Sequence, residues 1–125
     1  TMAPALAGGN TCVIVANSEN PLASITLAEA LATSDLPGGV VNILTGKVAE
    51  LSPWLSGHYD VNALVLDPLS DAMLKSTEQE ATTNLKRVIR SKTADPLSPY
   101  RILDLQEIKT TWHPIENIAG SGAAY

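Results

Sequence analysis

Short runs of consecutive apolar residues alternate along this chain with longer segments in which apolar residues recur every three or four positions. The uninterrupted runs predict strands that are covered on both faces, at 11–16, 40–44, 63–66 and, in mixed form, 86–90. The helical spacing predicts helices over 21–36, 48–55 and 69–82. Strands that alternate with helices on short connections form parallel sheets with right-handed crossovers. The pattern therefore predicts the α/β class.

Turn-forming residues mark the ends of the predicted helices. Asn20 is suited to cap the first helix and Pro21 to occupy its first position, while the Pro-Gly-Gly run at 37–39 ends it. Asp67, followed by Pro68, is predicted to cap the third helix with its carboxylate. Each predicted helix thus follows its strand directly.

The pattern changes after residue 90. Two prolines and few apolar residues predict a linker or long loop, and 101–115 mixes apolar and polar residues as an extended strand would, with a bend near 106–107. We divide the chain into an α/β part (1–92), a linker (93–100), a strand arm (101–115) and a flexible tail (116–125).

Composition narrows the classes of partner. The 125 residues fit one domain, 45% of them are apolar, and the net charge is −5 without a basic cluster, so neither nucleic acid nor an anionic membrane is an expected partner. No apolar run reaches the ~18 residues of a membrane span, and "TMAPALAGGN" does not resemble a secretion signal. A single cysteine excludes an internal disulfide and fits a cytoplasmic location. Helix-like residues directly after Thr1 suggest a segment that begins inside a longer parent domain.

Five motifs occur in a recognisable order over residues 4–88: "PALAGGN", "NSEN", "DLPGGVVNILTG", "HYDVNALVL" and "NLKRV". In order and spacing this series resembles the coenzyme-binding domain of aldehyde dehydrogenases. The resemblance implies a Rossmann-like, three-layer domain with a short parallel sheet of three to four strands flanked by helices. It also implies descent from enzymes that oxidise aldehydes to acids with NAD or NADP, through a cysteine nucleophile and a glutamate base.

A second, shorter motif, "LQEIKTTW" at 105–112, looks like the strand of the family's oligomerisation arm. In that family the arm pairs with a neighbouring subunit, as in β-augmentation. The resemblance implies an interface formed by Leu105, Ile108, Thr110 and Trp112. The implied partner is a second copy, giving a homo-oligomer, or an aldehyde dehydrogenase subunit.

The catalytic groups that the resemblance implies have no counterpart among these residues. Cys12 lies in a predicted buried strand, where a structural thiol is expected rather than a nucleophile. The family continues "NLKRV" with T-L-E, whereas this chain has Ser91 at the position of the glutamate. A serine is no base near neutral pH without an activating partner. We therefore assign no catalytic residue.

The coenzyme contacts are partly kept. Ala16 stands where the family has a lysine that contacts the adenosine ribose, whereas Glu19 matches the glutamate of the same loop. Gly46 matches a turn glycine near the adenine. Glu19 and Gly46 are the candidate cofactor-binding residues. The alternatives are a solvated carboxylate for Glu19 and a tight turn that requires positive φ for Gly46.

The third strand argues against a bound coenzyme. Where the family has a glycine-containing run before a helix, this chain has Asp67, Pro68 and, one turn on, Asp71. A proline removes an N–H donor, and two carboxylates repel a pyrophosphate. No cofactor is therefore expected, with NAD or NADP as the alternative. His58 and His113 lack the spacing of metal ligands, so no metal is assigned.

Three functions remain open from the sequence. The first is a non-catalytic aldehyde dehydrogenase-like domain that acts in homo- or hetero-oligomer assembly. The second is a fragment or subunit of an active NAD(P)-dependent aldehyde dehydrogenase, with the chemistry supplied elsewhere. The third is a nucleotide- or small-molecule-binding module that uses the crevice at the carboxyl ends of the strands.

Overall fold

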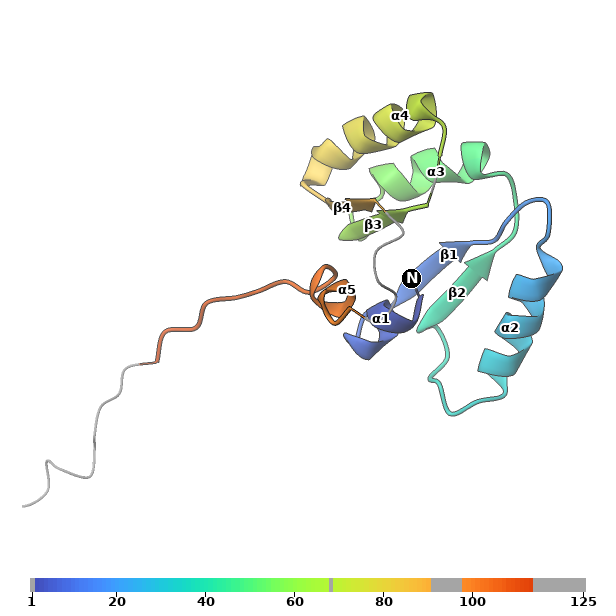
Figure 1. Ribbon diagram of the computed structural model, residues 1–125, viewed down its shortest axis with the longest axis horizontal. Coiled ribbons are helices and arrows are strands. Elements are labelled where there is room, and N and C mark those ends of the chain that lie inside the picture. The colour runs from blue at the N-terminus through green and yellow to red at the C-terminus, as the bar shows by residue number, and fades with distance from the viewer. Residues whose placement is uncertain (1, 68, 91–97, 114–125) are drawn as a thin grey trace, which may run out of the picture.

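Helices and strands alternate along the chain in the predicted order (Figure 1). The structure, a computed structural model, describes residues 2–67, 69–90 and 98–113. Its elements are α1 (Met2–Ala7), β1 (Cys12–Val15), α2 (Leu22–Ala32), β2 (Val41–Leu44), α3 (Val48–Gly57), β3 (Ala63–Leu66), α4 (Asp71–Ala81), a 3₁₀ turn (Thr82–Asn84), β4 (Arg87–Arg90) and α5 (Tyr100–Leu103). The α/β class and all four predicted strands are confirmed.

The strands pair in parallel, but as two pairs and not as one continuous ladder. β1 pairs with β2 so that Val15 lies opposite Leu44, and β3 pairs with β4 so that Leu66 lies opposite Arg90. No hydrogen-bonded ladder joins β1 to β3 within the described residues. Each pair belongs to one β-α-β segment and is supported by its own helices. The predicted single sheet of three to four strands is thus found as two short parallel sheets in a Rossmann-like arrangement.

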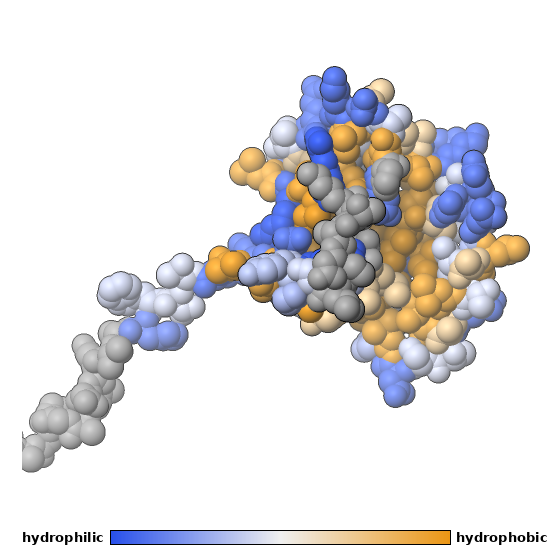
Figure 2. Space-filling view, in the orientation of Figure 1, coloured by the Kyte–Doolittle hydropathy of each residue, from blue (hydrophilic) through white to orange (hydrophobic). Residues whose placement is uncertain are grey.

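The strands are less covered than their composition predicts. Among the described residues, the buried apolar side chains are three alanines, Ala5, Ala16 and Ala81. Helix α2 packs beside β2, and α3 and α4 pack on each other above the β3–β4 pair (Figure 1). Apolar surface remains open near β1, β2 and α2 (Figure 2). The prediction of strands covered on both faces is wrong here, because the described helices do not cover every face.

Helix α2 starts at Leu22, one residue later than predicted. Pro21 is its N-cap residue and no side chain caps the helix, so the prediction that Asn20 is the cap is wrong. Pro21 has helical backbone angles, φ −75° and ψ −20°, and its carbonyl accepts the Ile25 N–H at 3.1 Å. The fixed φ of proline favours these helical angles directly before the helix. The helix ends at Ala32, where the Thr33 N–H donates to the Glu29 carbonyl, four residues before the predicted end.

A buried serine connects α3 to α4. The Ser56 side chain is fully buried, and its Oγ lies 2.8 Å from the Ser52 carbonyl and hydrogen-bonds Glu80 Oε2 on α4. A hydroxyl has one proton to donate, and the carboxylate is its stronger acceptor. The helix pair is therefore held by a polar contact as well as by apolar packing.

A buried lysine closes the turn that precedes β4. Lys86 Nζ donates to the His58 carbonyl and to Asn84 Oδ1, while Asn84 Nδ2 donates to the Tyr59 carbonyl at 2.9 Å. We call these four residues the Lys86 clasp. The clasp fixes the segment after α4 to the loop between α3 and β3, and so sets where β4 enters its sheet.

Between two members of the clasp, Leu85 adopts a left-handed backbone with φ 55° and ψ 41°, and its side chain is 90% exposed. This conformation costs a residue with a Cβ about 1–2 kcal/mol. Leu85→Gly is expected to raise the free energy of unfolding by about 0.5–1 kcal/mol in urea titrations, since no buried contact is lost. Leu85→Ala, which keeps the Cβ, is the control. An equal gain from alanine would attribute the effect to the leucine side chain and contradict the prediction.

The C-terminal segment differs from the predicted strand. Residues 100–103 form helix α5, with Pro99 in helical conformation before it and the Asp104 N–H bonded to the Tyr100 carbonyl at 2.8 Å. Gln106 Nε2 then donates to the Gly8 carbonyl at 2.8 Å, next to the contact between α5 and α1. The predicted strand is wrong for residues 101–105, because the turn bonds after Pro99 close locally.

Residues 106–113, which we call the arm, extend away from the rest of the chain (Figure 1). They are in no strand, since no described segment lies beside them to accept their hydrogen bonds. Most of the predicted linker (93–97) and the whole predicted tail (116–125) lie outside the described residues. Within the described residues, no helix has the length and apolar character needed to cross a membrane.

Candidate functional site

The carboxyl ends of parallel strands are the usual ligand position in folds of this class. Because β1 and β2 run in parallel with Val15 opposite Leu44, the loops that carry Glu19 and Gly46 leave the sheet at the same edge. Asp67 follows β3 directly and Asp71 begins α4. This edge holds both candidate cofactor-binding residues.

Ala16, at the position where the family resemblance implies a lysine, has no open space around its side chain. Ala16 is buried, and its N–H donates to the Leu44 carbonyl at 2.8 Å, which continues the β1–β2 ladder by one residue. A long side chain at Ala16 would have to displace its neighbours. Glu19 remains exposed, and its N–H donates to Asn17 Oδ1 at 2.9 Å in an Asx turn.

Gly46 lies in the turn between β2 and α3 with φ +155°. A Cβ built there would lie 3.0 Å from Leu51 Cδ1, a side chain of α3. Both observations fit the alternative interpretation, a close turn that favours glycine. The neighbouring Lys47 is exposed, and its Nζ lies 3.6 Å from Glu50 Oε1. It is a cation at this edge that the sequence analysis did not name. Its position directly after Gly46 could have marked it as a residue of the strand-end edge.

The start of α4 is capped by its own residues. Ser70 precedes the helix, and its side chain accepts the Met73 N–H at 3.5 Å. Asp71 adds a carboxylate in the first turn, as expected. The prediction that Asp67 caps this helix is wrong, because the helix starts at Asp71 and the serine is the adjacent acceptor. Pro68 lies outside the described residues.

The end of β4 is tied down by an ion pair. Arg90 donates Nε to Glu78 Oε1 at 2.8 Å and Nη2 to Glu78 Oε2 at 2.9 Å, so strand and helix α4 are joined by a bidentate contact. Ser91, the position of the family's glutamate, lies outside the described residues. This ion pair holds Arg90, the last residue of β4, against α4.

The remaining candidate groups are structural in this arrangement. Burial raises the pKa of the Cys12 thiol, which leaves less of the reactive thiolate at neutral pH. His58 Nδ1 accepts the Asp60 N–H at 3.2 Å within a turn. Across the described part of the chain, no three His, Cys, Asp or Glu side chains come together as a set that could hold a metal ion.

The four predicted interface residues do not share one setting. Leu105 is half-buried at the end of the α5 turn, whereas Thr110 and the arm's apolar residues are exposed. Ile108 is 85% exposed and Trp112 is 89% exposed. The arm therefore presents two large apolar side chains that the described chain does not cover.

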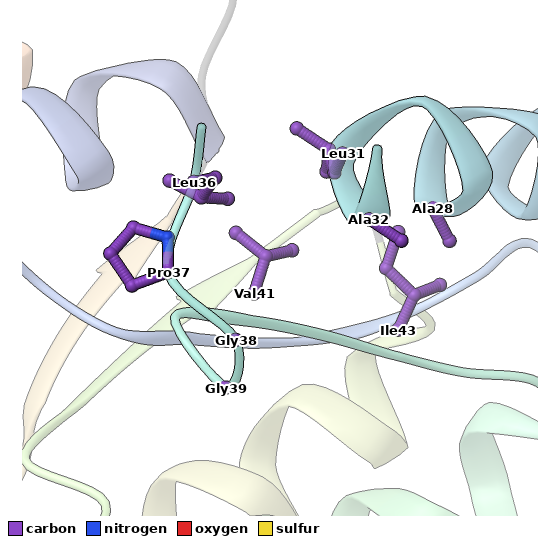
Figure 3. A pocket seen from close by; sticks show the side chains of 9 residues that line it. All are labelled: Ala28, Leu31, Ala32, Leu36, Pro37, Gly38, Gly39, Val41 and Ile43. Carbon is purple, nitrogen blue, oxygen red and sulfur yellow. The ribbon is translucent and has the colours of Figure 1, made fainter. Parts of the chain in front are cut away.

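An apolar groove lies apart from the strand ends, between α2 and the start of β2 (Figure 3). Its volume is about 260 Å³. It is lined by Ala28, Leu31, Ala32, Leu36, Pro37, Gly38, Gly39, Val41 and Ile43. The sequence pattern did not predict this groove, because it depends on how α2 packs beside β2.

The segment that matches known proteins contains most of the described helices and strands. The model of the aldehyde dehydrogenase family matches residues 1–91. The chain is 32% identical over 87 residues to the NADP/NAD-dependent aldehyde dehydrogenase PuuC of Escherichia coli K12, which is 70% of this chain and 18% of the relative. It is 33% identical over the same length and shares to the mitochondrial aldehyde dehydrogenase of Leishmania tarentolae.

The chain thus spans about a fifth of the length of these relatives, and no solved structure matches it. The matched segment contains both β-α-β segments and ends at residue 91, directly after β4, whereas the arm lies outside it. The family model and the two relatives agree with one another. This chain belongs to the aldehyde dehydrogenase family.

Proposed function

We propose that this chain is a non-catalytic assembly module of the aldehyde dehydrogenase family and associates through its arm, in a homo-oligomer or with an aldehyde dehydrogenase subunit. The observation that carries the proposal is the arm itself, with Ile108 and Trp112 almost fully exposed. Large aromatic and aliphatic side chains gain about 1.5–3 kcal/mol each when they are buried. Contact with a partner supplies that burial.

The root of the arm supports this function. The Gln106–Gly8 hydrogen bond and the contact between α5 and α1 fix where the arm leaves the domain. A fixed root lowers the ordering entropy that a partner must overcome when it binds the arm.

The strand ends give less support to coenzyme binding. Ala16 is packed, Ser70 caps α4, and Asp71 places a negative charge in its first turn. These features disfavour a pyrophosphate at that helix. Glu19 and Gly46 keep open the alternative of a fragment or subunit of an active NAD(P)-dependent aldehyde dehydrogenase. The single cysteine fits work in a reducing compartment, the cytoplasm.

Trp112→Glu is expected to weaken association at least ~10-fold, because the substitution removes a large apolar contact and places a charge in the interface. Sedimentation velocity over a range of concentrations measures it. Trp54→Glu is the matched control, since Trp54 is also an exposed tryptophan, at 79%, but lies on α3. A chain that stays monomeric alone and with an added aldehyde dehydrogenase subunit would contradict the proposal. So would equal losses in the two variants.

A further inference from the structure

Residues 98–106, which we call the latch and which end at the first residue of the arm, lie against α1 with little burial (Figure 1). Helix α5 within the latch is four residues long and has no buried residue, and Tyr100 and Leu103 are 70% and 50% exposed. Within the described residues, the hydrogen bond that ties the latch to the rest of the fold runs from Gln106 Nε2 to the Gly8 carbonyl, at 2.8 Å.

This hydrogen bond depends on glycine at position 8. A Cβ built at Gly8 would overlap Gln106 Nε2 and would lie 3.2 Å from Gln106 Cδ. Both atoms belong to the far end of a flexible side chain, which can turn to another rotamer while the backbone around Gly8 stays in place. A side chain at position 8 therefore displaces the amide of Gln106 and spares the fold around it.

The end of α1 is closed by bonds that do not involve the latch. The Gly8 N–H donates to the Pro4 carbonyl at 3.1 Å, and both the N–H and the Nδ2 of Asn10 donate to the Ala5 carbonyl at 3.1 Å. The strand that follows is held by its own ladder with β2. Departure of the latch therefore leaves α1 and β1 with their own hydrogen bonds.

We propose that the latch opens and closes on a fold that otherwise stays intact, and that the Gln106–Gly8 bond decides between the two states. Segments with few buried contacts open locally at a lower free energy than the whole chain unfolds. The net contribution of one amide–carbonyl hydrogen bond shifts such an equilibrium by about 5-fold. Loss of this bond alone therefore changes the fraction of open latch by a measurable factor.

The latch regulates the arm, and this part of the inference rests on the proposed assembly function. With the latch closed, the root of the arm is fixed at Gly8 before a partner binds. With the latch open, the partner must order the latch as well as the arm, which lowers the affinity. The fraction of closed latch thus sets the apparent affinity of the arm for its partner.

Amide hydrogen exchange followed by NMR in the full chain measures the opening. The N–H groups of Asp104 and Gln106 donate within the latch at 2.8 Å and 3.0 Å, so their exchange reports the open state. Gly8→Ala is expected to speed their exchange at least ~5-fold and to leave the Leu74 N–H of α4 unchanged.

Gly57→Ala is the matched control, since Gly57 has open space where a Cβ would stand and no positive φ. Equal exchange of the latch amides in Gly8→Ala and Gly57→Ala would overturn the inference. Latch amides that exchange as slowly as those of β1 in the unaltered chain would overturn it too, because the segment would then open only when the whole chain unfolds.

A second variant tests whether Gly8 acts through Gln106. Gln106→Ala is expected to speed exchange of the Asp104 N–H as Gly8→Ala does, and the double variant to be no faster than Gln106→Ala alone, because both changes remove the same bond. Effects that multiply in the double variant would place the action of position 8 elsewhere in α1 and contradict the inference.

Sedimentation separates the latch from the proposed function. Gly8→Ala is expected to weaken association about 5-fold while Ile108 and Trp112 remain in place, and Gly57→Ala to leave it unchanged. Faster exchange without weaker association would overturn the regulation of the arm. A chain that never associates would overturn the proposed function, while the exchange rates of Gly8→Ala and Gln106→Ala still decide whether the latch exists.

Discussion

Replacing Lys86 with methionine is expected to lower the free energy of unfolding by about 2–4 kcal/mol. The ammonium of Lys86 donates to the His58 carbonyl and to Asn84 Oδ1 from a buried position. Methionine keeps most of the stem but leaves both acceptors without that donor. Hydrogen bonds to charged groups contribute about 1.5–3 kcal/mol each, and loss of the buried charge itself offsets part of the sum.

Urea denaturation followed by far-UV circular dichroism measures the Lys86→Met loss. Lys75→Met is the matched control, because Lys75 is exposed on α4, and its replacement should change stability by less than ~0.5 kcal/mol. The Lys86 clasp also positions β4, so the loss should be accompanied by faster amide exchange in Arg87–Arg90 than in β1. A Lys86→Met protein as stable as the Lys75→Met protein would show that the clasp contributes nothing.

Ser56→Ala is expected to lower the free energy of unfolding by about 2 kcal/mol. The hydroxyl is fully buried between α3 and α4 and bonds the Glu80 carboxylate. Alanine leaves that half-buried carboxylate without this donor, and the loss exceeds the small gain from the higher helix propensity of alanine. The α3–α4 pair covers the β3–β4 sheet, so the weakened contact affects that half of the fold (Figure 1).

Ser76→Ala isolates the propensity gain. Ser76 lies on α4 and bonds the Met73 carbonyl at 3.1 Å, as Ser56 bonds carbonyls of its own helix, but it is exposed and bonds no carboxylate. Its replacement is expected to be neutral or slightly stabilising in the same urea titration. If the Ser56→Ala and Ser76→Ala proteins had the same free energy of unfolding, the hydrogen bond between Ser56 and Glu80 would contribute nothing to stability.

The sequence predicted elements well where local pattern decides them. The run 63–66 became β3 with the same bounds, since consecutive apolar residues between polar turns leave few other solutions. Pro21 precedes α2 directly in helical conformation, which its fixed φ favours. The cap of α4 was assigned to the wrong residue, because Asp67 offered a stronger acceptor than Ser70 in the sequence alone, whereas the helix starts at Asp71 and Ser70 is adjacent to it.

Features set by distant contacts could not be predicted. The segment 101–105 has strand-like residues, but no described strand lies beside it to pair with, so it forms local turn bonds after Pro99 and α5 packs against α1. Whether strands form one sheet or two depends on how β1 and β3 approach, which no local pattern specifies. The groove depends on the packing of α2 against β2 and on the small residues between them. Lys86 was not noticed because a lysine before a strand is usually solvated.

The Gln106–Gly8 bond has a consequence for the order in which the chain folds. Each β-α-β segment closes over a few tens of residues, whereas this bond joins residues 98 apart in sequence. Contacts of long sequence separation form after local ones, because chain closure must precede them. The position of Gln106, the first residue of the arm, is therefore set after the local β-α-β segments have closed, which makes the root of the arm one of the late parts of the fold.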